Sequence, residues 1–297
     1  MKKKSELLDR EVPGWLSGIL IVGVGLTILY FEKKRPLRKP RQDKIRRNVR
    51  NLFMSATTAA TIRVSEKPLT TYLMKEGKRR NFGLFRMVRM PPWLEVILSV
   101  VLLDYTLFVW HYLTHRVPLL WRLHQSHHVD LDLDASTALR FHPVEMLLSA
   151  PWRGAQVFLL GISPLSLAVW QLMTLLEIMF HHSNINLPID LERKLVKLIV
   201  TPRMHGIHHS IVQKETDSNW STIFTWPDYI HGTLQLNVPQ EEITIGVAAF
   251  QDPKELTLGE VLKMPATADR PSWRLPGNGK PERDKDVLPG TKINLVA

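Results

Sequence analysis

Residues 93–115 read WLEVILSVVLLDYTLFVWHYLTH, an apolar run that leads directly into two histidines. The eighteen residues from Trp93 to Trp110 carry two acidic side chains and follow a pair of prolines, a pattern that favours a helix starting there. His111 and His115 are four residues apart and therefore share one face of this helix. The stretch thus predicts an apolar helix whose end carries histidines able to bind a metal.

Histidine is concentrated in the same part of the chain. All twelve histidines fall between His111 and His231, and the pattern His-x-x-His-His occurs twice. Residues at i, i+3 and i+4 share a helix face, so each pattern predicts one cluster of imidazoles. The second pattern follows Thr201 and Pro202, where the threonine can cap a helix and the proline can take its first position. Eight imidazoles are therefore expected on three helix faces: His111, His115, His124, His127, His128, His205, His208 and His209.

The number and type of these side chains indicate a site for two metal ions. One ion takes about four to six ligands, so eight or nine imidazoles exceed what one ion needs. Imidazole suits iron, copper, zinc or nickel, and ligand type does not choose among them. Cysteine is absent, which excludes disulfides, thiolate zinc sites and cysteine-ligated clusters. His-Glu-x-x-His, Glu-x-x-His, Gly-x-Ser-x-Gly and glycine-rich phosphate loops are also missing.

Many of the basic residues are clustered directly after an apolar run that is predicted to be a membrane anchor. The uncharged run WLSGILIVGVGLTILYF, Trp15–Phe31, is followed by ten basic residues between 33 and 50. This pattern is typical of a membrane span with a cytoplasmic flank. No small-residue cleavage site follows the run, so an uncleaved anchor is expected rather than a signal peptide. The net charge of +11 is therefore not interpreted as a nucleic-acid site, and no nucleic-acid partner is expected.

A third apolar region is divided by GISP at residues 161–164 into segments 146–160 and 165–180. Each segment is short for a full crossing, so a helical hairpin dipping into the bilayer and two spans both remain open. In either case the chain returns to the face that it left. His182 is therefore expected on the same side as His111.

Three other segments complete the predicted organisation. Residues 51–64 are only moderately apolar and could form a short span, a re-entrant hairpin or an interfacial helix. A second basic cluster lies at 63–89, and if both clusters are cytoplasmic the segment between them does not cross. IDLERKLVKLIV, residues 189–200, predicts an amphipathic helix.

The predicted fold class is all-α, an integral-membrane helical protein whose histidine-rich dimetal domain faces the cytoplasm. An N-terminal membrane anchor and basic segment is expected at 1–92, and a membrane-embedded catalytic domain at 93–263. Residues 264–297, rich in Pro, Lys and Asp, are expected to form a flexible tail.

The residues around the histidines resemble the fatty acid hydroxylase and sterol desaturase superfamily of integral-membrane di-iron enzymes, most of all its bacterial sterol desaturase-like branch. The resemblance covers roughly Asp104 to Lys263 and rests on DYTLFVWHYLTHRVPLLWRLHQSHH, DLDASTALRFHPVE, FHHSNINLP, TPRMHGIHHS and ETDSNWSTIFTWPDYIHGTL. It implies that the eight histidines named above are metal ligands. It adds His182, which lies in FHHSN, as a ninth.

Six further side chains lie where they could support the ligands, by holding imidazole N–H groups or by packing against them. An ordinary role as a cap, a turn or a packing residue is the alternative for each. They are Asp104, Asp134, His142, His181, Asp217 and Asn219.

Two departures from the family pattern are visible. His231 replaces an aromatic residue, and its role is open. Arg203 stands where an acidic residue is common, and could alter contact with a redox partner or a headgroup.

The resemblance implies an oxygenase that uses O2 and two iron ions, or zinc as purified, to hydroxylate or desaturate a lipid C–H bond. Electrons are expected from a ferredoxin, a small cytochrome or a reductase, because the chain shows no flavin, nicotinamide or haem signature. The bacterial inner membrane is the expected location. An alkylglycerol-type ether-lipid monooxygenase is the alternative enzyme, and a non-catalytic membrane metal-binding protein is the alternative from another class. A sterol, fatty acyl, carotenoid or ether lipid all remain open as substrate.

Overall fold

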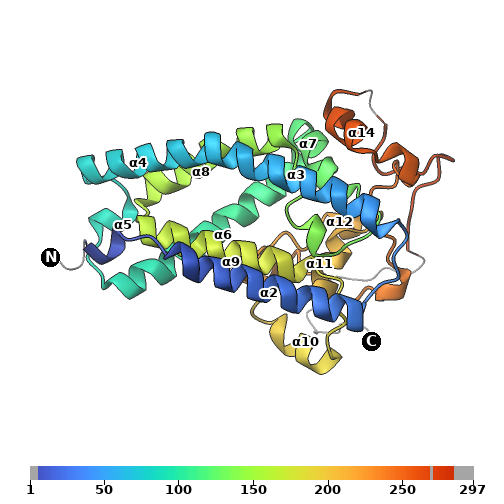
Figure 1. Ribbon diagram of the computed structural model, residues 1–297, viewed down its shortest axis with the longest axis horizontal. Helices are drawn as coiled ribbons and strands as arrows, with labels where there is room; N and C mark the ends of the chain where they lie inside the picture. Colours follow the sequence, from blue (N-terminus) through green and yellow to red (C-terminus); the bar gives the residue numbers. More distant parts are fainter. Residues whose placement is uncertain (1–5, 268–269, 284–297) are drawn as a thin grey trace.

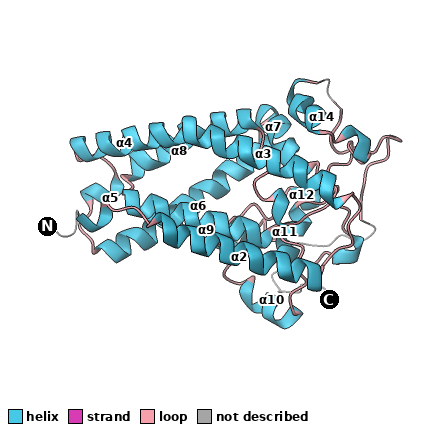
Figure 2. Ribbon diagram, viewed as in Figure 1, coloured by secondary structure: helices cyan, strands magenta, loops and turns pink. Residues whose placement is uncertain are grey.

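The computed structural model describes residues 6–267 and 270–283, which form helices and loops without a β-strand among them (Figure 2). The predicted all-α class is therefore confirmed. Six helices of fifteen residues or more form the frame: α2 (Gly14–Lys34), α3 (Lys44–Val64), α4 (Glu66–Arg80), α6 (Pro92–Arg116), α8 (Pro143–Leu160) and α9 (Pro164–His181). The shorter helices are α5 (Leu84–Met87), α7 (Pro118–His128), η1 (Ala135–Thr137), α10 (Ile189–Leu195), α11 (Pro202–His208), α12 (Gln213–Thr216), α13 (Trp226–His231), η2 (Gln240–Glu242), η3 (Pro253–Glu255), α14 (Leu258–Lys263) and η4 (Met264–Ala266).

Three of the long helices, α2, α6 and α9, are long and apolar enough to cross a membrane. In α2 only 6% of the apolar window is buried inside the protein, and large side chains such as Trp15 and Leu26 are exposed. A helix that is apolar on all sides and leaves most of its surface uncovered by protein needs lipid around it. The segments predicted as spans, Trp15–Phe31 and Trp93–Trp110, thus form apolar helices that are long enough to cross a membrane.

The third apolar region forms the helical pair α8 and α9, joined by a tight turn. Gly161 ends α8 with φ of +70°, and Pro164 occupies the first turn of α9 behind a Ser163 cap. Among the described helices, α9 meets the length and composition of a span and α8 does not. Gly83 packs against the turn so closely that a Cβ there would lie 2.4 Å from the Gly161 Cα. Glycine is therefore required at position 83.

Helices α3 and α4 run along α8, on the side of the molecule away from α2 (Figure 1). Residues 51–64 belong to α3, which begins at Lys44, inside the predicted basic flank. Because α3 and α4 lead from the histidine end of the molecule to the opposite end, the basic residues near 33–50 and near 75–89 lie at opposite ends (Figure 1). The two basic clusters therefore cannot share one side of a membrane that α2, α6 and α9 cross.

Short helices gather at the end of the bundle where α2, α6 and α9 finish (Figure 1). The predicted amphipathic helix at 189–200 is only seven residues long, ending at Leu195. Pro202 starts α11 as predicted, but the Thr201 side chain makes no capping hydrogen bond, and its buried hydroxyl has no hydrogen-bond partner in residues 6–267 and 270–283. The cap expected from the Thr-Pro pair is thus not formed.

Part of the predicted tail packs against this end. Trp273 stacks on Trp121 with ring centroids 5.1 Å apart, and the Trp121 indole donates to the Ser272 hydroxyl at 3.0 Å. The Arg283 guanidinium pairs with the buried Glu215 carboxylate at 2.5 Å. The segment 270–283 is thus held by specific contacts, while residues 284–297 lie outside the described part of the chain.

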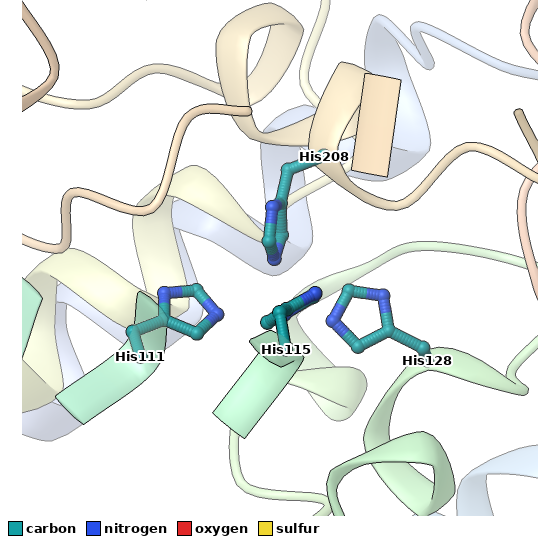
Figure 3. A group of neighbouring side chains, drawn as sticks. All are labelled: His111, His115, His128 and His208. Carbon is teal, nitrogen blue, oxygen red and sulfur yellow. The ribbon is translucent and has the colours of Figure 1, made fainter. Parts of the chain in front are cut away.

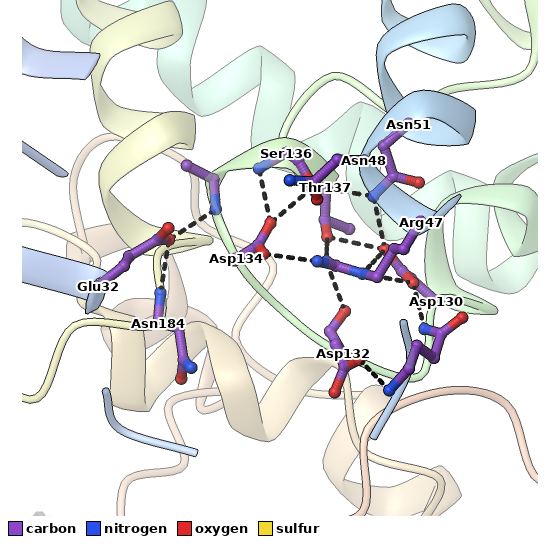
Figure 4. Close-up of polar contacts among 12 residues, drawn as sticks. Glu32, Arg47, Asn48, Asn51, Asp130, Asp132, Asp134, Ser136, Thr137 and Asn184 are labelled. Carbon is purple, nitrogen blue, oxygen red and sulfur yellow. Dashed lines mark hydrogen bonds and ion pairs between the residues drawn. The ribbon is translucent and has the colours of Figure 1, made fainter. Parts of the chain in front are cut away.

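A buried ionic network joins α3 to the loop that follows α7 (Figure 4). The Asp130 carboxylate accepts from Arg47 Nε and Arg50 Nη2, each at 3.0 Å, and Arg140 Nη1 lies 3.3 Å away. Burial by itself would raise the pKa of Asp130, but the charges of the three arginines outweigh it and hold the pKa well below the usual value. Since Asp130 is two residues beyond His128, this network fixes the end of the α7 histidine motif.

We expect Asp130→Asn to lower the free energy of unfolding by about 3–5 kcal/mol, because it leaves buried arginines without their shared counter-charge. Asp190 provides a matched control, since its pair with Arg193 is solvent-exposed. Asp190→Asn should cost less than about 1 kcal/mol. Thermal unfolding of the detergent-solubilised protein measures both, and equal effects of the two variants would contradict the structural role of Asp130.

Candidate metal centre

Eight histidines converge into two groups, and each group could hold one metal ion. In each group, one ring nitrogen from every residue lies within 4.8 Å of the corresponding nitrogens of the others. Figure 3 shows the four imidazoles of the first group turned toward a common space. The first histidine group is His111, His115, His128 and His208. The second histidine group is His127, His182, His205 and His209.

Adjacent histidines go to different groups. His127 and His128 are neighbours in the chain, yet they face the second and the first group respectively, and His208 and His209 divide in the same way. The rings of His128 and His209 stack between the groups, with centroids 4.3 Å apart. Each His-x-x-His-His motif therefore contributes to both groups, so the predicted clustering by helix face does not describe the site.

Backbone carbonyls orient the imidazoles of the first histidine group. His111 Nδ1 lies 2.8 Å from the Trp220 carbonyl oxygen, and His208 Nδ1 lies 2.7 Å from that of Ser218. A carbonyl can only accept, so each Nδ1 carries the proton and each Nε2 has a free lone pair. The unprotonated nitrogens are the ones available to a metal ion.

The second histidine group has its Nε2 atoms in contact. His182 Nε2 is 3.1 Å from both His127 Nε2 and His205 Nε2, and His205 Nε2 is 3.1 Å from His209 Nε2. His182 Nδ1 lies 2.7 Å from the Ile178 carbonyl oxygen and therefore donates to it. The Nε2 lone pair of His182 thus faces the Nε2 atoms of His127 and His205.

The surroundings keep these imidazoles neutral. Burial is the main cause that lowers the pKa of His208 and of His182 to about 3. Burial and then neighbouring imidazoles lower the pKa values of His127, His128 and His209 well below the usual value. Neutral imidazole is the form that binds a metal.

The residues fit a pair of bound cations. Several buried ring nitrogens, among them both nitrogens of His115 and of His128 and Nε2 of His208, have no hydrogen-bond partner among the described residues. Buried polar atoms normally find a partner, so nitrogens that face one another without one mark a missing ligand. An all-imidazole donor set suits a transition metal rather than calcium or magnesium.

Two more histidines border the groups without belonging to either. The His124 ring lies 5.0–5.2 Å from those of His111, His115 and His128, measured between centroids. Its Nδ1 lies 2.8 Å from the buried Glu145 carboxylate, and its Nε2 has no partner among the described residues. His181 packs on the second group instead, with its ring centroid 4.1 Å from that of His205.

One loop, residues 218–224, supplies the carbonyls that orient His111 and His208. Asn219 has a left-handed backbone with φ of +55°, and its buried amide donates to the Met204 and Gln235 carbonyls and accepts from the Gln235 N–H. Asp228 accepts from the N–H groups of residues 220 and 221, and Asp104 from those of residues 223 and 224. These side chains shape the loop and do not contact an imidazole.

The other predicted supporting residues also bind groups other than the ligands. Asp134 accepts from Arg47 and from Ser136, and Asp217 pairs with Arg116 at 3.1 Å. His142 caps α8 through the Val144 N–H, and its other nitrogen lies 3.1 Å from the Leu262 carbonyl. The prediction that Asp134, Asp217, Asn219 or Asp104 holds an imidazole N–H is therefore wrong. The acceptors are instead the backbone carbonyls of residues 178, 218 and 220 and the Glu145 carboxylate.

The two departures from the family pattern have structural explanations. Arg203 is buried and forms an ion pair with Glu192, so it does not present its charge to a partner. His231 is exposed, stacks on Phe108 with centroids 5.1 Å apart and lies 3.2 Å from the Tyr105 hydroxyl. It takes part in aromatic packing at the edge of α6.

Glu145 and Asp130 are functional supports that the sequence interpretation missed. Glu145 lies three residues after His142 in the motif FHPVE, and a lone acidic residue in the first turn of a helix beside histidines is a usable signal. Asp130 offers no comparable signal, because its partners Arg47 and Arg50 lie eighty or more residues earlier in the chain.

Asn219→Ala should destabilise the protein by about 2–4 kcal/mol, because it removes buried hydrogen bonds and puts strain on a left-handed residue. Asn278 is also left-handed, at φ of +67°, but it is exposed and its side chain accepts only a solvent-exposed hydrogen bond from Arg274, so Asn278→Ala controls for backbone strain without the loss of buried hydrogen bonds. Asn219→Gly relieves the strain and leaves the hydrogen bonds missing, so it should recover only part of the loss. Thermal unfolding of the three variants checks this, and full recovery by glycine would contradict the role of the hydrogen bonds.

Comparisons with known proteins agree with this geometry. The fatty acid hydroxylase family model matches residues 96–233, which contain all eight grouped histidines. Ornithine lipid hydroxylase OlsE of Rhizobium tropici is 26% identical over 243 residues, covering 78% of this chain and 71% of that protein. No solved structure matches the chain.

Two human enzymes are similar over shorter regions. Alkylglycerol monooxygenase is 28% identical over 172 residues, covering 56% of this chain and 36% of that protein. Cholesterol 25-hydroxylase is 28% identical over 144 residues, covering 48% of this chain and 51% of that protein. The three apolar helices and the two histidine groups make this chain an integral membrane protein, and its residues 96–233 match the fatty acid hydroxylase family.

Proposed function

We propose that this protein is an O2-dependent oxidoreductase that holds two iron ions and hydroxylates or desaturates a C–H bond of a membrane lipid. The observation that carries the proposal is the pair of buried four-histidine groups at the end of apolar helices. Bound redox metal supplies the oxygen activation that attack on an unactivated C–H bond requires, which side-chain acids and bases cannot supply.

The chain's own part is to hold the two ions in a dry, oriented setting. We assign the first histidine group to one ion and the second histidine group to the other. His124 is assigned to the first ion as a fifth ligand, because Glu145 holds its Nδ1 and no group in the described part of the chain bonds its buried Nε2. A carboxylate on the far nitrogen fixes the orientation and raises the basicity of a ligating imidazole.

The apolar helices bring substrate and site together. His111 and His115 lie on the last turns of α6, and His182 directly follows α9, so the ligands are attached to two of the candidate spans. A lipid lying among these helices reaches the histidine groups without passing through water. This arrangement supports a lipid substrate of the kind expected from the sequence.

Electrons must come from a separate donor, for which the exposed basic segment after α2 is suited. Lys33, Lys34, Lys39 and Arg41 are exposed there, and the Leu37 N–H donates to the carbonyl of Asn184, two residues beyond His182. This cluster could attract an acidic ferredoxin or cytochrome, or anionic lipid headgroups. The ten basic residues between 33 and 50 outnumber the six between 75 and 89 at the opposite end, and this balance supports a cytoplasmic position for the histidine end, in a bacterial inner membrane.

Ether-lipid oxygenation is the second candidate. Its support is the similarity of 172 residues to human alkylglycerol monooxygenase. The two candidates share the metal site and differ in product. Cleavage of an alkylglycerol would favour the ether-lipid activity, and an alcohol or alkene on an intact lipid would favour the first proposal.

The division into two groups predicts the metal content of variants. After iron loading, the wild-type protein should hold about two ions per chain, as an eight-imidazole set requires. His115→Ala with His208→Ala should remove one ion, and His182→Ala with His209→Ala should remove the other. His231→Ala, outside both groups, should keep both. Elemental analysis of detergent-purified protein measures each.

Other outcomes of that analysis are equally informative. If no loading condition gives a stoichiometric metal, both the dimetal site and the mechanism are wrong. Two zinc ions in the purified protein would require exchange for iron before any assay. A protein that holds two irons but consumes no O2 with any lipid and reductant would instead be a non-catalytic metal-binding protein.

Activity should depend on both groups together. Iron-loaded protein, a chemical reductant and a bacterial lipid extract should yield oxygenated or desaturated lipid only when O2 is present, as detected by mass spectrometry. Each double variant should lose at least about 100-fold of this product, since neither ion alone completes the site. Equal product from wild type and variants would show that the activity comes from a contaminant.

A further inference from the structure

A line of polar side chains with unpartnered atoms runs along one face of α9. Trp170 Nε1, Thr174 Oγ1, Glu177 Oε1 and His181 Nδ1 are all buried and have no hydrogen-bond partner among the described residues. Their spacing of i, i+4, i+7 and i+11 places them on the same side of the helix. We call these four residues the α9 polar stripe.

Glu177 is the exceptional member of the stripe. It is a carboxyl group within a helix long and apolar enough to span a membrane, and no hydrogen bond or ion pair holds it among the described residues. Other buried acidic groups of the spans are satisfied, since Glu32 accepts from two backbone N–H groups and Asp104 accepts from two others. Ionisable residues inside a membrane are costly and commonly mark a binding site or a pathway.

The stripe leads to the metal centre. Glu177 is one helical turn, about 6 Å, before His181 along the axis of α9. The His181 ring lies 4.1 Å from that of His205 in the second histidine group, measured between centroids. At the other end, Trp170 is 3% exposed and its ring is covered by Arg153 of α8. Thr174 and Glu177 are half-buried, with Oγ1 and Oε1 covered by the protein, so the row of polar groups lies along the surface that α9 shares with the bundle and ends beside the candidate ligands.

We propose that the α9 polar stripe is a binding subsite for a polar group of the lipid substrate, with Glu177 as its main contact. This inference rests on the proposed function and narrows its substrate class to lipids that carry a hydroxyl or amide near the reacting carbon. A carboxyl group accepts from an O–H or N–H, and in its protonated form it donates to a carbonyl or hydroxyl oxygen. A bare hydrocarbon chain offers neither and would leave the group unsatisfied.

The subsite would decide which carbon reacts. An anchored polar group fixes the depth of the lipid along α9, and so selects the carbon that lies next to the histidine groups. Thr174 and Trp170 add a hydroxyl and an indole N–H farther from the metal centre, where a longer polar part of the lipid could bind. Glu177 acts here as a positioning residue for substrate, and has no role in holding the metal.

Three variants test the proposal. Glu177→Leu removes the polar group at similar volume, and Glu177→Gln keeps hydrogen-bonding capacity. Gln171→Leu is the matched control, a polar residue of the same helix that is exposed and lies off the stripe. All three should retain the metal content of the wild type. Glu177→Leu should lower kcat/KM for the lipid product by about tenfold or more, as expected for one lost hydrogen bond to a charged group.

Product position separates substrate recognition from a general structural role. Glu177→Leu should spread oxygenation over neighbouring carbons, Glu177→Gln should largely keep the wild-type position, and Gln171→Leu should match the wild type in both rate and position. If Glu177→Leu gives the same rate and the same product as Gln171→Leu, the inference is overturned.

Binding of a probe tests the subsite independently of turnover. A 1-O-alkylglycerol with a brominated chain should quench Trp170 fluorescence, identified as the signal lost in Trp170→Phe, whereas the brominated alkane of equal length should bind at least about tenfold more weakly. Glu177→Leu should abolish that preference. Quenching that does not distinguish the two probes, or that Glu177→Leu leaves unchanged, overturns the inference. Preferential binding by a wild type that forms no product would leave the subsite standing and the oxygenase proposal rejected.

Discussion

Burial of eight imidazoles in two adjacent groups is the constraint on which the rest of the structure depends. Nitrogens in such an environment must be neutral, correctly oriented and matched by a ligand, because each unsatisfied polar group is costly. The protein keeps most of the imidazoles neutral and oriented without a hydrogen bond from the ring to a carboxylate. Carbonyls of residues 178, 218 and 220 take the Nδ1 protons and direct the free lone pairs inward. Within the described part of the chain, only His124 uses a carboxylate, that of Glu145.

The supporting structure reaches well beyond the histidine motifs. Arg47 and Arg50 of α3 hold Asp130, which follows His128, and the α9-to-α10 loop contacts the segment between α2 and α3. Removing one partner of a buried ion pair lowers the free energy of unfolding far more than replacing both partners with apolar residues. The N-terminal segment predicted as a separate anchor region is thus part of the frame of the site, although the family match begins only at residue 96.

The relation between membrane and site follows from where the helices end. Helices α6 and α9 are candidate spans that finish in histidines, so a lipid beside them is already near the metal centre. Polar atoms inside such helices require a reason, and the carboxylates of Glu32 and Asp104 have one in the backbone N–H groups that they accept from. The α9 polar stripe lacks such partners, and a polar lipid group supplies the chemistry that it is missing.

The sequence by itself determined the helical class, the apolar helices and seven of the eight grouped histidines, because periodicity, hydropathy and residue type are local properties. The family resemblance added His182, and the spacing also included His124, which lies in neither group. It could not determine how those histidines divide. Neighbours such as His127 and His128 point to different groups, and that division depends on where α6, α9 and α11 meet. Only the tertiary structure could assign Glu145 to His124 and Asp130 to Arg47, or show that Asn219 shapes a loop and holds no imidazole. Such contacts join residues far apart in the chain, so no local pattern encodes them.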